Sequence, residues 1–321
     1  MNNFTYARLR TFRLCPQKHH YMYNEEIKGK ETGLFLSKKL FSRCLSAYLT
    51  NETDDIAKAI KEFRKAAREG DIEVPEDTLD YVFESYCMHN ASDLRDEEII
   101  VVDQGFREVL DEEDDDTFYV HIDRLIYNKK LDMVILRNTK VSLDAINSDF
   151  NQTNDNEKLL TAVPFIEEVQ GLRVQAIETD HVRLAKLQPV PINKNGKPTG
   201  NRKDLGLVTY EDYMEVIRDQ GLEHAPEYQR TIEWLQQRGH PLFRRTQAQI
   251  INRDKLDINN SNNHDTYRLI KTGYKYMNRG ALCWKCQFKE LCNIDFNTLN
   301  SSTRDHLIEK LLRQSTEDSE E

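Results

Sequence analysis

Apolar side chains recur at every third or fourth position in the first third of the chain. Residues 33–50 place them at Leu36 and Leu40, for example, which is the period of an α-helix with one buried face. The same spacing predicts helices over residues 3–13, 54–69 and 76–91. This part of the chain is therefore expected to be mainly helical.

From about residue 99 onward the apolar positions alternate with polar ones. In residues 118–127, Tyr119 and His121 alternate with apolar neighbours, which is the period of a strand with one buried face. The alternation predicts strands over residues 99–110, 118–127, 131–139 and 172–180. The loops between the first three strands are short, so these strands are expected to be antiparallel neighbours. A helix is expected over residues 155–169, before the fourth strand.

The last part of the chain mixes helical patterns with loops. Residues 189–204 are rich in proline, glycine and lysine, which predicts an exposed loop. Residues 243–252 are expected to form a strand or an extended arm. Helices are expected over residues 209–219, 225–238, 265–278 and 303–313. Helices and strands in this order predict an α/β (α+β) fold.

The composition allows a folded core beneath a strongly charged surface. Hydrophobic residues make up 38% of the 321 residues and charged residues 31%, which suits one large domain or two small ones. No apolar run approaches the ~20 residues that cross a bilayer. The first residues lack the apolar stretch of a signal peptide. We therefore expect a cytoplasmic protein with no membrane partner.

Charge is distributed unevenly along the chain. The net charge of −10 argues against a general polyanion binder. Residues 1–50, however, hold nine Lys and Arg against three Asp and Glu, and residues 181–205 hold six against one. Residues 51–116 hold seven against twenty-three, which we interpret as a solvated acidic face. Because local patches decide where a polyanion binds, the two basic segments keep DNA binding open.

Three cysteines stand close together near the C-terminus. Cys283, Cys286 and Cys292 have the spacing Cys-x2-Cys-x5-Cys, which lets thiolates share one metal centre. Six cysteines are too few for a disulfide scaffold, and Cys15 offers a fourth thiolate. The spacing leaves two metals open, an iron–sulfur cluster or zinc with a histidine as an alternative fourth ligand. The histidines considered for zinc are His264 and His306.

Several motifs spread over nearly the whole chain occur together in one known family. They are a Cys-Pro followed by aromatics at residues 15–23, the "IDR" strand at residues 122–124, the loop at residues 189–200, the "FRR" segment at residues 243–245 and the three C-terminal cysteines. The combination resembles the RecB-like nucleases of the PD-(D/E)XK superfamily. Within it, the chain is most similar to the iron–sulfur branch, which includes CRISPR-associated exonucleases and many bacteriophage proteins.

The resemblance implies a cofactor and a domain organisation. A 4Fe–4S cluster would be held by Cys15, Cys283, Cys286 and Cys292 and would clamp the two chain ends around a central mixed sheet flanked by helices. The segments implied are one nuclease-fold domain at 1–313, a helical insertion at about 51–95, an iron–sulfur segment at 279–295 and a disordered acidic tail at 314–321.

The resemblance also identifies an active site, and most of its positions differ here. An active member binds Mg2+ or Mn2+ through a strand Asp, an acid-x-Lys pair on the next strand and a histidine on an early helix. Asp123 fits the strand Asp. Leu136 and Asn138 stand at the acid and lysine positions, and Lys140 lies two residues further on. One carboxylate does not hold a catalytic metal against water, so we predict weak or absent nuclease activity.

Cations occur where an active member would carry acids and a histidine. Such side chains can bind a phosphate directly, without a metal. The residues predicted to contact DNA are Lys38, Lys39, Arg137, Lys140, Lys194, Lys197, Arg202, Lys203, Arg244 and Arg245. Asp123 and Lys140 are the candidates for catalysis if an active site is retained.

Three functions remain open from the sequence. The first is a DNA-binding protein for single strands or ends, with catalysis lost, acting in phage DNA recombination, replication or repair. The second is an active Mg2+- or Mn2+-dependent exonuclease with a rearranged site. The third is an interaction factor whose acidic residues 51–116 dock a helicase, a recombinase or another phage or host protein. The chain contains no GxxxxGK[ST] motif, so no P-loop motor is expected in it.

Overall fold

The computed structural model describes residues 2–24, 33–145 and 152–274, together with Cys283, Cys286, Phe288 and Cys292. The helix expected over residues 303–313, the acidic tail and His306 lie outside these residues. The chain divides into two units. The terminal unit combines Met1–Glu31, Gly105–Val120 and Asn252–Glu321, and the central unit combines Thr32–Gln104 and His121–Ile251. The division falls within two strands, and each unit is described by itself.

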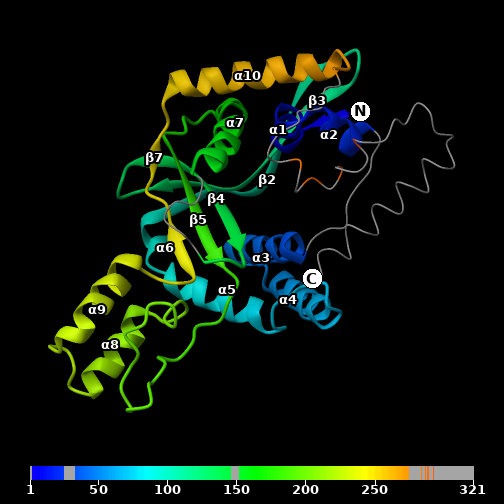
Figure 1. The fold of residues 1–321 in the computed structure, drawn as a ribbon. Coiled ribbons are helices and arrows are strands. Elements are labelled where there is room, and N and C mark those ends of the chain that lie inside the picture. The colour runs from blue at the N-terminus through cyan, green and yellow to red at the C-terminus, as the bar shows by residue number, and fades with distance from the viewer. Residues whose placement is uncertain are drawn as a thin grey trace. The chain divides into compact units, whose positions relative to one another are not determined.

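The terminal unit joins the first and last described segments of the chain. Its elements are β1 (Asn2–Phe4), α1 (Tyr6–Leu14), α2 (Pro16–His19), the π-helix η1 (His20–Asn24) and α10 (Arg253–Lys271) (Figure 1). On α1, the guanidinium of Arg13 donates to Thr266 (2.8 Å) and Asn263 (2.5 Å) of α10. The ring of Phe4 meets that of Tyr267 edge-on at 4.9 Å. The described N-terminal and C-terminal helices therefore pack on each other.

A mixed sheet forms the middle of the central unit. Its strands are β2 (Glu97–Asp111), β3 (Asp116–Asn128), β4 (Met133–Ser142), β5 (Ala176–Arg183), β6 (Phe243–Arg245) and β7 (Gln249–Ile250). β2 pairs with β3, β3 runs antiparallel to β4, and β5 pairs antiparallel with β6 and β7. β4 and β5 are parallel, which requires a crossover, and α7 (Gln152–Gln170) supplies it. The expected α+β class with a mixed sheet is confirmed.

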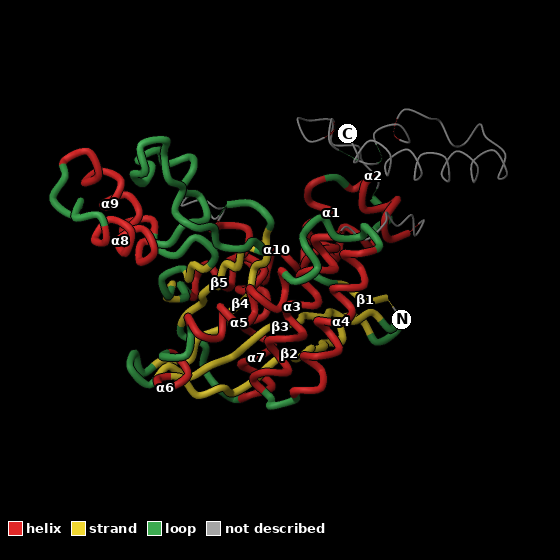
Figure 2. Tube along the Cα trace, turned by 90° about the horizontal axis from the view of Figure 1, so that it is seen from below, coloured by secondary structure: helices red, strands yellow, loops and turns green. Residues whose placement is uncertain are grey.

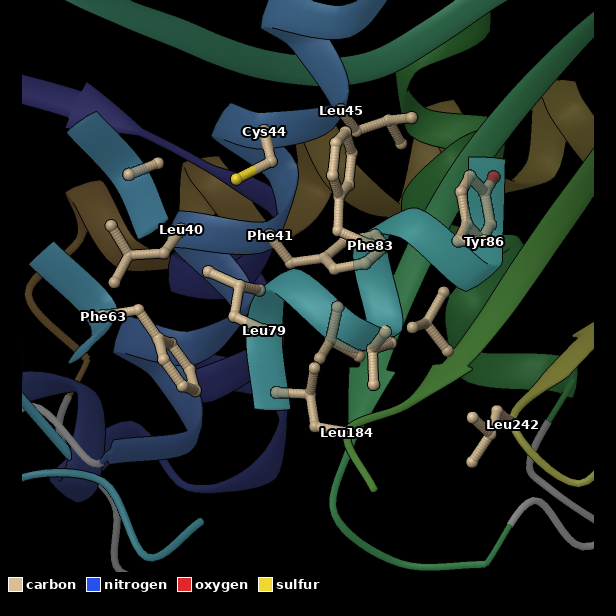
Figure 3. Packing of buried hydrophobic residues seen from close by; sticks show 14 of the residues in the cluster. Leu40, Phe41, Cys44, Leu45, Phe63, Leu79, Phe83, Tyr86, Leu184 and Leu242 are labelled. Atoms are coloured by element: carbon tan, nitrogen blue, oxygen red, sulfur yellow. The ribbon is translucent and has the colours of Figure 1, made fainter. Parts of the chain in front are cut away.

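Helices cover the two faces of this sheet. Those that precede the strands are α3 (Gly33–Leu49), α4 (Thr53–Arg68), α5 (Thr78–His89) and the short α6 (Asp93–Asp96). Phe41 of α3 and Phe83 of α5 share one buried cluster with Val141 of β4 and Val182 of β5 (Figure 3). Because side chains alternate along a strand, α3 and α5 cover the face that carries these valines. We call it the α5 face, and the opposite face, which α7 approaches, the α7 face.

A helical hairpin follows the sheet, formed by α8 (Tyr210–Asp219) and α9 (Pro226–Arg238). It has its own core, which includes Leu205, Tyr213 and Leu235. The long loop before α8, green in Figure 2, is folded on itself, since the side chain of Asn193 accepts the backbone N–H of Lys197 at 3.1 Å. This side-chain bond fixes the turn that the Pro/Gly-rich sequence predicts.

Most predicted elements are present with shifted ends, and α10 shows the largest difference. The helix was expected to begin at residue 265, but it begins at Arg253. Its first half is rich in asparagine, which has a low helix propensity. The side chain of Asn252 caps it by accepting the N–H of Lys255, and Leu256 is buried, so capping and packing outweigh propensity. None of the described helices is long and apolar enough to cross a membrane.

Candidate functional site

Asp123 lies on β3, the strand that pairs with β4. Its carboxylate accepts the backbone N–H of Thr139 at 2.6 Å. Together with Ser46 and Asp103 it lines a cavity of only about 10 Å³. A cavity of this size holds about one water molecule. The carboxylate therefore completes the hydrogen bonding of the sheet, and the space beside it is too small for a substrate.

The positions expected to carry an acid and a lysine have different chemistry. Leu136 is fully buried. Asn138 is buried too, and its amide oxygen accepts a long hydrogen bond from Nζ of Lys158 on α7 at 3.4 Å. Asp103 lines the same small cavity as Asp123, and its carboxylate accepts a hydrogen bond from Nε2 of His121 at 2.8 Å. This hydrogen bond lowers the pKa of Asp103. The neighbouring acid thus already has a partner.

The α5 face carries a buried charge cluster centred on Asp180, which we call the Asp180 network. Oδ2 of Asp180 accepts Nη2 of Arg124 (2.7 Å) and the hydroxyl of Tyr86 (2.7 Å). Oδ1 accepts Nε of Arg245 on β6 at 2.5 Å. Burial alone would raise the pKa of Asp180, but the charges of Arg124 and Arg245 outweigh it and hold the pKa well below its usual range. Asp180 is therefore ionised and saturated with donors.

Arg137 is the centre of a second buried charge cluster on the same face, with two carboxylate partners. Its guanidinium donates to both carboxylate oxygens of Glu97 (2.7 and 2.6 Å) and to Glu178 (2.9 and 2.8 Å). Only 1% of Arg137 is exposed. A cation enclosed by two carboxylates holds the sheet together and cannot reach a DNA phosphate. The prediction that Arg137 contacts DNA is corrected accordingly.

Arg245 requires the same correction. It binds Asp180, and its other nitrogens donate to Asp93 and to the side chain of Asn90 (3.0 Å). Arg245 therefore joins α5, α6 and β6. The sequence could not separate it from Arg244, because the separation depends on which face of β6 each side chain takes.

The other predicted cations lie in several places. Lys39 on α3 is exposed and Lys38 is half-buried. In the loop before α8, Lys194, Lys197 and Lys203 are exposed. Arg202 is exposed as well, but its guanidinium lies 5.7 Å from the ring of Trp234 and donates to the carbonyl of Arg230 at 3.2 Å.

Lys140, His181 and Arg244 form a row across three adjacent strands. The register pairs Lys140 of β4 with His181 of β5, and His181 with Arg244 of β6. Paired residues project from the same face of a sheet, so the row lies on the α7 face. Arg244 is exposed and Lys140 is half-buried. Sequence reasoning missed His181, since only the register places it between two cations.

A larger cavity, of about 280 Å³, borders β6. Its lining includes His89 of α5, Ser92, Phe243 and Arg244. The ring of His240 stacks on Phe243, with centroids 4.7 Å apart and planes within 7°, and it lies 5.0 Å from His89. We call this space the His89 cavity. Burial lowers the pKa of His89, and burial likewise lowers the pKa of His240 to about 4, so the ring of His240 is neutral at pH 7.

The four cysteines expected to bind a metal all belong to the terminal unit, and all are half-buried and outside any disulfide. The N–H of Cys286 donates to the carbonyl of Cys283 at 3.2 Å, which closes a tight turn. Phe288, between Cys286 and Cys292, is buried with its ring 5.5 Å from that of Tyr21 in η1, six residues after Cys15. Across the described residues, no three His, Cys, Asp or Glu side chains are close enough to form a metal site as they stand.

A scan against protein-family models and a search of curated proteins gave no match to this chain. The family resemblance therefore rests on the sequence motifs themselves.

Proposed function

We propose that this chain is a DNA-binding protein built on a RecB-like PD-(D/E)XK nuclease scaffold, and that it does not hydrolyse DNA through a bound Mg2+ or Mn2+. The mixed α+β architecture is compatible with that scaffold. The observation that carries the proposal is the environment of Asp123. Its carboxylate accepts the N–H of Thr139 and faces a cavity of about 10 Å³.

Catalysis by this class of site needs several oxygen ligands around one cation. Mg2+ requires near-octahedral oxygen coordination, and hydrolysis requires room for a metal-bound water and a phosphate. Leu136 offers no ligand, and Asn138 is buried against Lys158. A residual carboxylate engaged by the backbone is a poor substitute for the missing groups.

Direct phosphate binding by side chains remains available. The exposed Arg244 ends the row on the α7 face, and the loop before α8 adds exposed lysines. Cations on such surfaces bind the phosphate backbone with little dependence on sequence, and salt weakens the binding by counterion release. The binding is thus expected to need no divalent metal.

We also infer a 4Fe–4S cluster on Cys15, Cys283, Cys286 and Cys292. The donor set suits it, since all four are cysteines of one unit that form no disulfide, and the Tyr21–Phe288 contact brings the two cysteine-bearing segments together. When bound, the cluster would crosslink the two ends of the chain. Because the described sulfurs do not form a ready metal site, binding would require them to close in.

Iron and zinc analysis of anaerobically purified protein tests the cluster. We expect about four irons per chain, and a marked loss of iron in Cys15→Ser. Closing a loop of nearly the whole chain stabilises it by roughly 4–5 kcal/mol on a disulfide-type estimate, so the variant should also melt at lower temperature. Cys44→Ser, which alters a cysteine buried in the central unit, is the control for iron content. A colourless protein with stoichiometric zinc would contradict the iron assignment.

A nuclease assay tests the loss of catalysis. Labelled single-stranded and duplex DNA incubated with Mn2+ should stay intact, for the wild type as for Asp123→Ala. If the wild type degrades DNA and Asp123→Ala does not, the site is active and the chain is an exonuclease. If no DNA is bound even at low salt, the interaction-factor hypothesis becomes the better one.

A further inference from the structure

The His89 cavity combines an aromatic wall with an accessible cation. The aromatic rings that line it include His89 and Phe243, whose centroids lie 5.4 Å apart. His240 is not part of the lining, but its ring stacks nearly parallel on that of Phe243. His89 is the exposed member and lines the cavity. An imidazole offers a ring face on which another planar ring can stack.

The charged side chains around the cavity differ in whether they form ion pairs. The carboxylates of Asp93 and Asp180 also line it, but Arg245 binds both, and Arg124 adds a second cation to Asp180. Arg244 differs, since it is exposed and has no ion pair with any residue that the structure describes. The one cation left for an anionic ligand at this cavity, within the described part of the chain, is thus Arg244.

The size of the cavity limits its ligand. About 280 Å³ is at the lower end of the ~300–1,000 Å³ that small-molecule pockets occupy. A single base with its sugar suits such a space, whereas a base pair does not. The exposed hydroxyl of Ser92 and the paired Asp93 provide polar atoms at the rim.

We propose that the His89 cavity binds one unpaired nucleotide, with its base stacked on His89 and its phosphate at Arg244. The inference rests on the proposed DNA-binding function and deepens it, because it commits to single-stranded rather than duplex DNA at this site. A free mononucleotide has the same chemistry as a nucleotide within a strand, so the test separates the two sources.

Fluorescence anisotropy of a labelled oligothymidylate, in EDTA and low salt, measures strand binding. His89→Ala should weaken it about 10-fold, the size of one base–aromatic stack. His89→Phe keeps a ring face and should stay within about 3-fold of the wild type. His224→Ala, at an exposed histidine outside the cavity lining, is the matched control and should bind like the wild type. Duplex binding should not depend on His89. Melting temperatures of all variants verify folding.

Three further results distinguish failure of the inference from failure of the proposed function. Strand binding that is unaffected in His89→Ala overturns the nucleotide site and leaves DNA binding intact. Binding of thymidine monophosphate alone, lost in His89→Ala, with no strand binding, supports the cavity but assigns it to a free nucleotide and overturns the DNA function. Absence of binding to strand and mononucleotide overturns both.

Discussion

Arg244 and Arg245 are adjacent in sequence and on β6, yet they have opposite surroundings. Arg245 is held by Asp180, Asp93 and Asn90 on the α5 face. Arg244 is exposed and continues the row that begins at Lys140 on the α7 face. One side of the strand therefore uses its cation to hold the fold, and the other leaves its cation exposed to solvent.

The same division applies to the sheet as a whole. On the α5 face, Arg124, Arg137 and Arg245 are enclosed by carboxylates. A buried pair of this kind is costly to break but adds little net stability compared with an apolar packing of the same shape. The cations of the α7 face are less buried. Neither the positive charge of a side chain nor its position in the sequence therefore tells whether it holds the fold or is open to a partner.

Neutralising the centre of the Asp180 network should have the largest effect. Asp180→Asn leaves Arg124 buried without its counter-charge and takes from Arg245 one of its carboxylate partners, so the free energy of unfolding should fall by about 3–5 kcal/mol. Urea denaturation measures it. Glu84→Gln, which alters an exposed acid of α5, should change it by less than about 0.5 kcal/mol. Equal stability of the two variants would show that the network does not hold the sheet.

Truncating the two arginines of β6 should separate stability from binding. Arg245→Ala should lower the free energy of unfolding by about 3 kcal/mol, because it leaves Asp93 without its cation and removes one of the two cations that bind the buried Asp180. Arg244→Ala should change it by less than about 0.5 kcal/mol. Thermal and urea unfolding compare them. A destabilised Arg244→Ala would contradict the assignment of this side chain to a partner.

The binding of the Arg244→Ala variant should differ from that of the wild type in its salt dependence. Each phosphate contact adds about 0.7 to the slope of log affinity against log salt for a single strand. Loss of one contact should lower that slope by about this amount and weaken binding similarly for all sequences. Anisotropy titrations from low to moderate salt measure the slope, with Arg218→Ala on α8 as a control for charge. An unchanged slope would place Arg244 outside the interface.

The pH dependence of stability should be smaller in a variant that lacks the imidazole of His240. The pKa of His240 is about 4 in the folded chain, below the ~6.5 of an unfolded histidine. The unfolded state therefore takes up the proton first, so the contribution is complete above pH ~6.5 and is lost as the pH falls toward 4. His240→Phe should melt with a smaller drop between pH 7 and pH 5. His19, with a pKa also near 4, keeps part of the drop.

The sequence predicted the local elements well, because their apolar periods are clear. The helices α3, α4, α5, α8 and α9 and the strands β2 to β5 follow the predicted ranges within a few residues. α10 was predicted too short, since its asparagines have low helix propensity and its cap and packing supply the difference.

The site was harder to predict because it depends on register. The sequence singled out Arg137 and Arg245 as DNA contacts, and their partners Glu97, Glu178 and Asp180 come from other strands or from far along the chain. His181 and His89 were missed for the same reason. The sequence shows directly that Leu136 stands at the position expected to carry an acid. The burial of Leu136 agrees with an apolar role.

DNA binding without a metal is best measured by the anisotropy of labelled single-stranded DNA titrated with wild-type protein, in EDTA and again in Mn2+, with the DNA length checked afterwards. The account predicts the same affinity in both, full-length DNA in both, and weaker binding for Arg244→Glu. Binding that appears only with Mn2+, accompanied by shortened DNA that Asp123→Ala restores to full length, would contradict it.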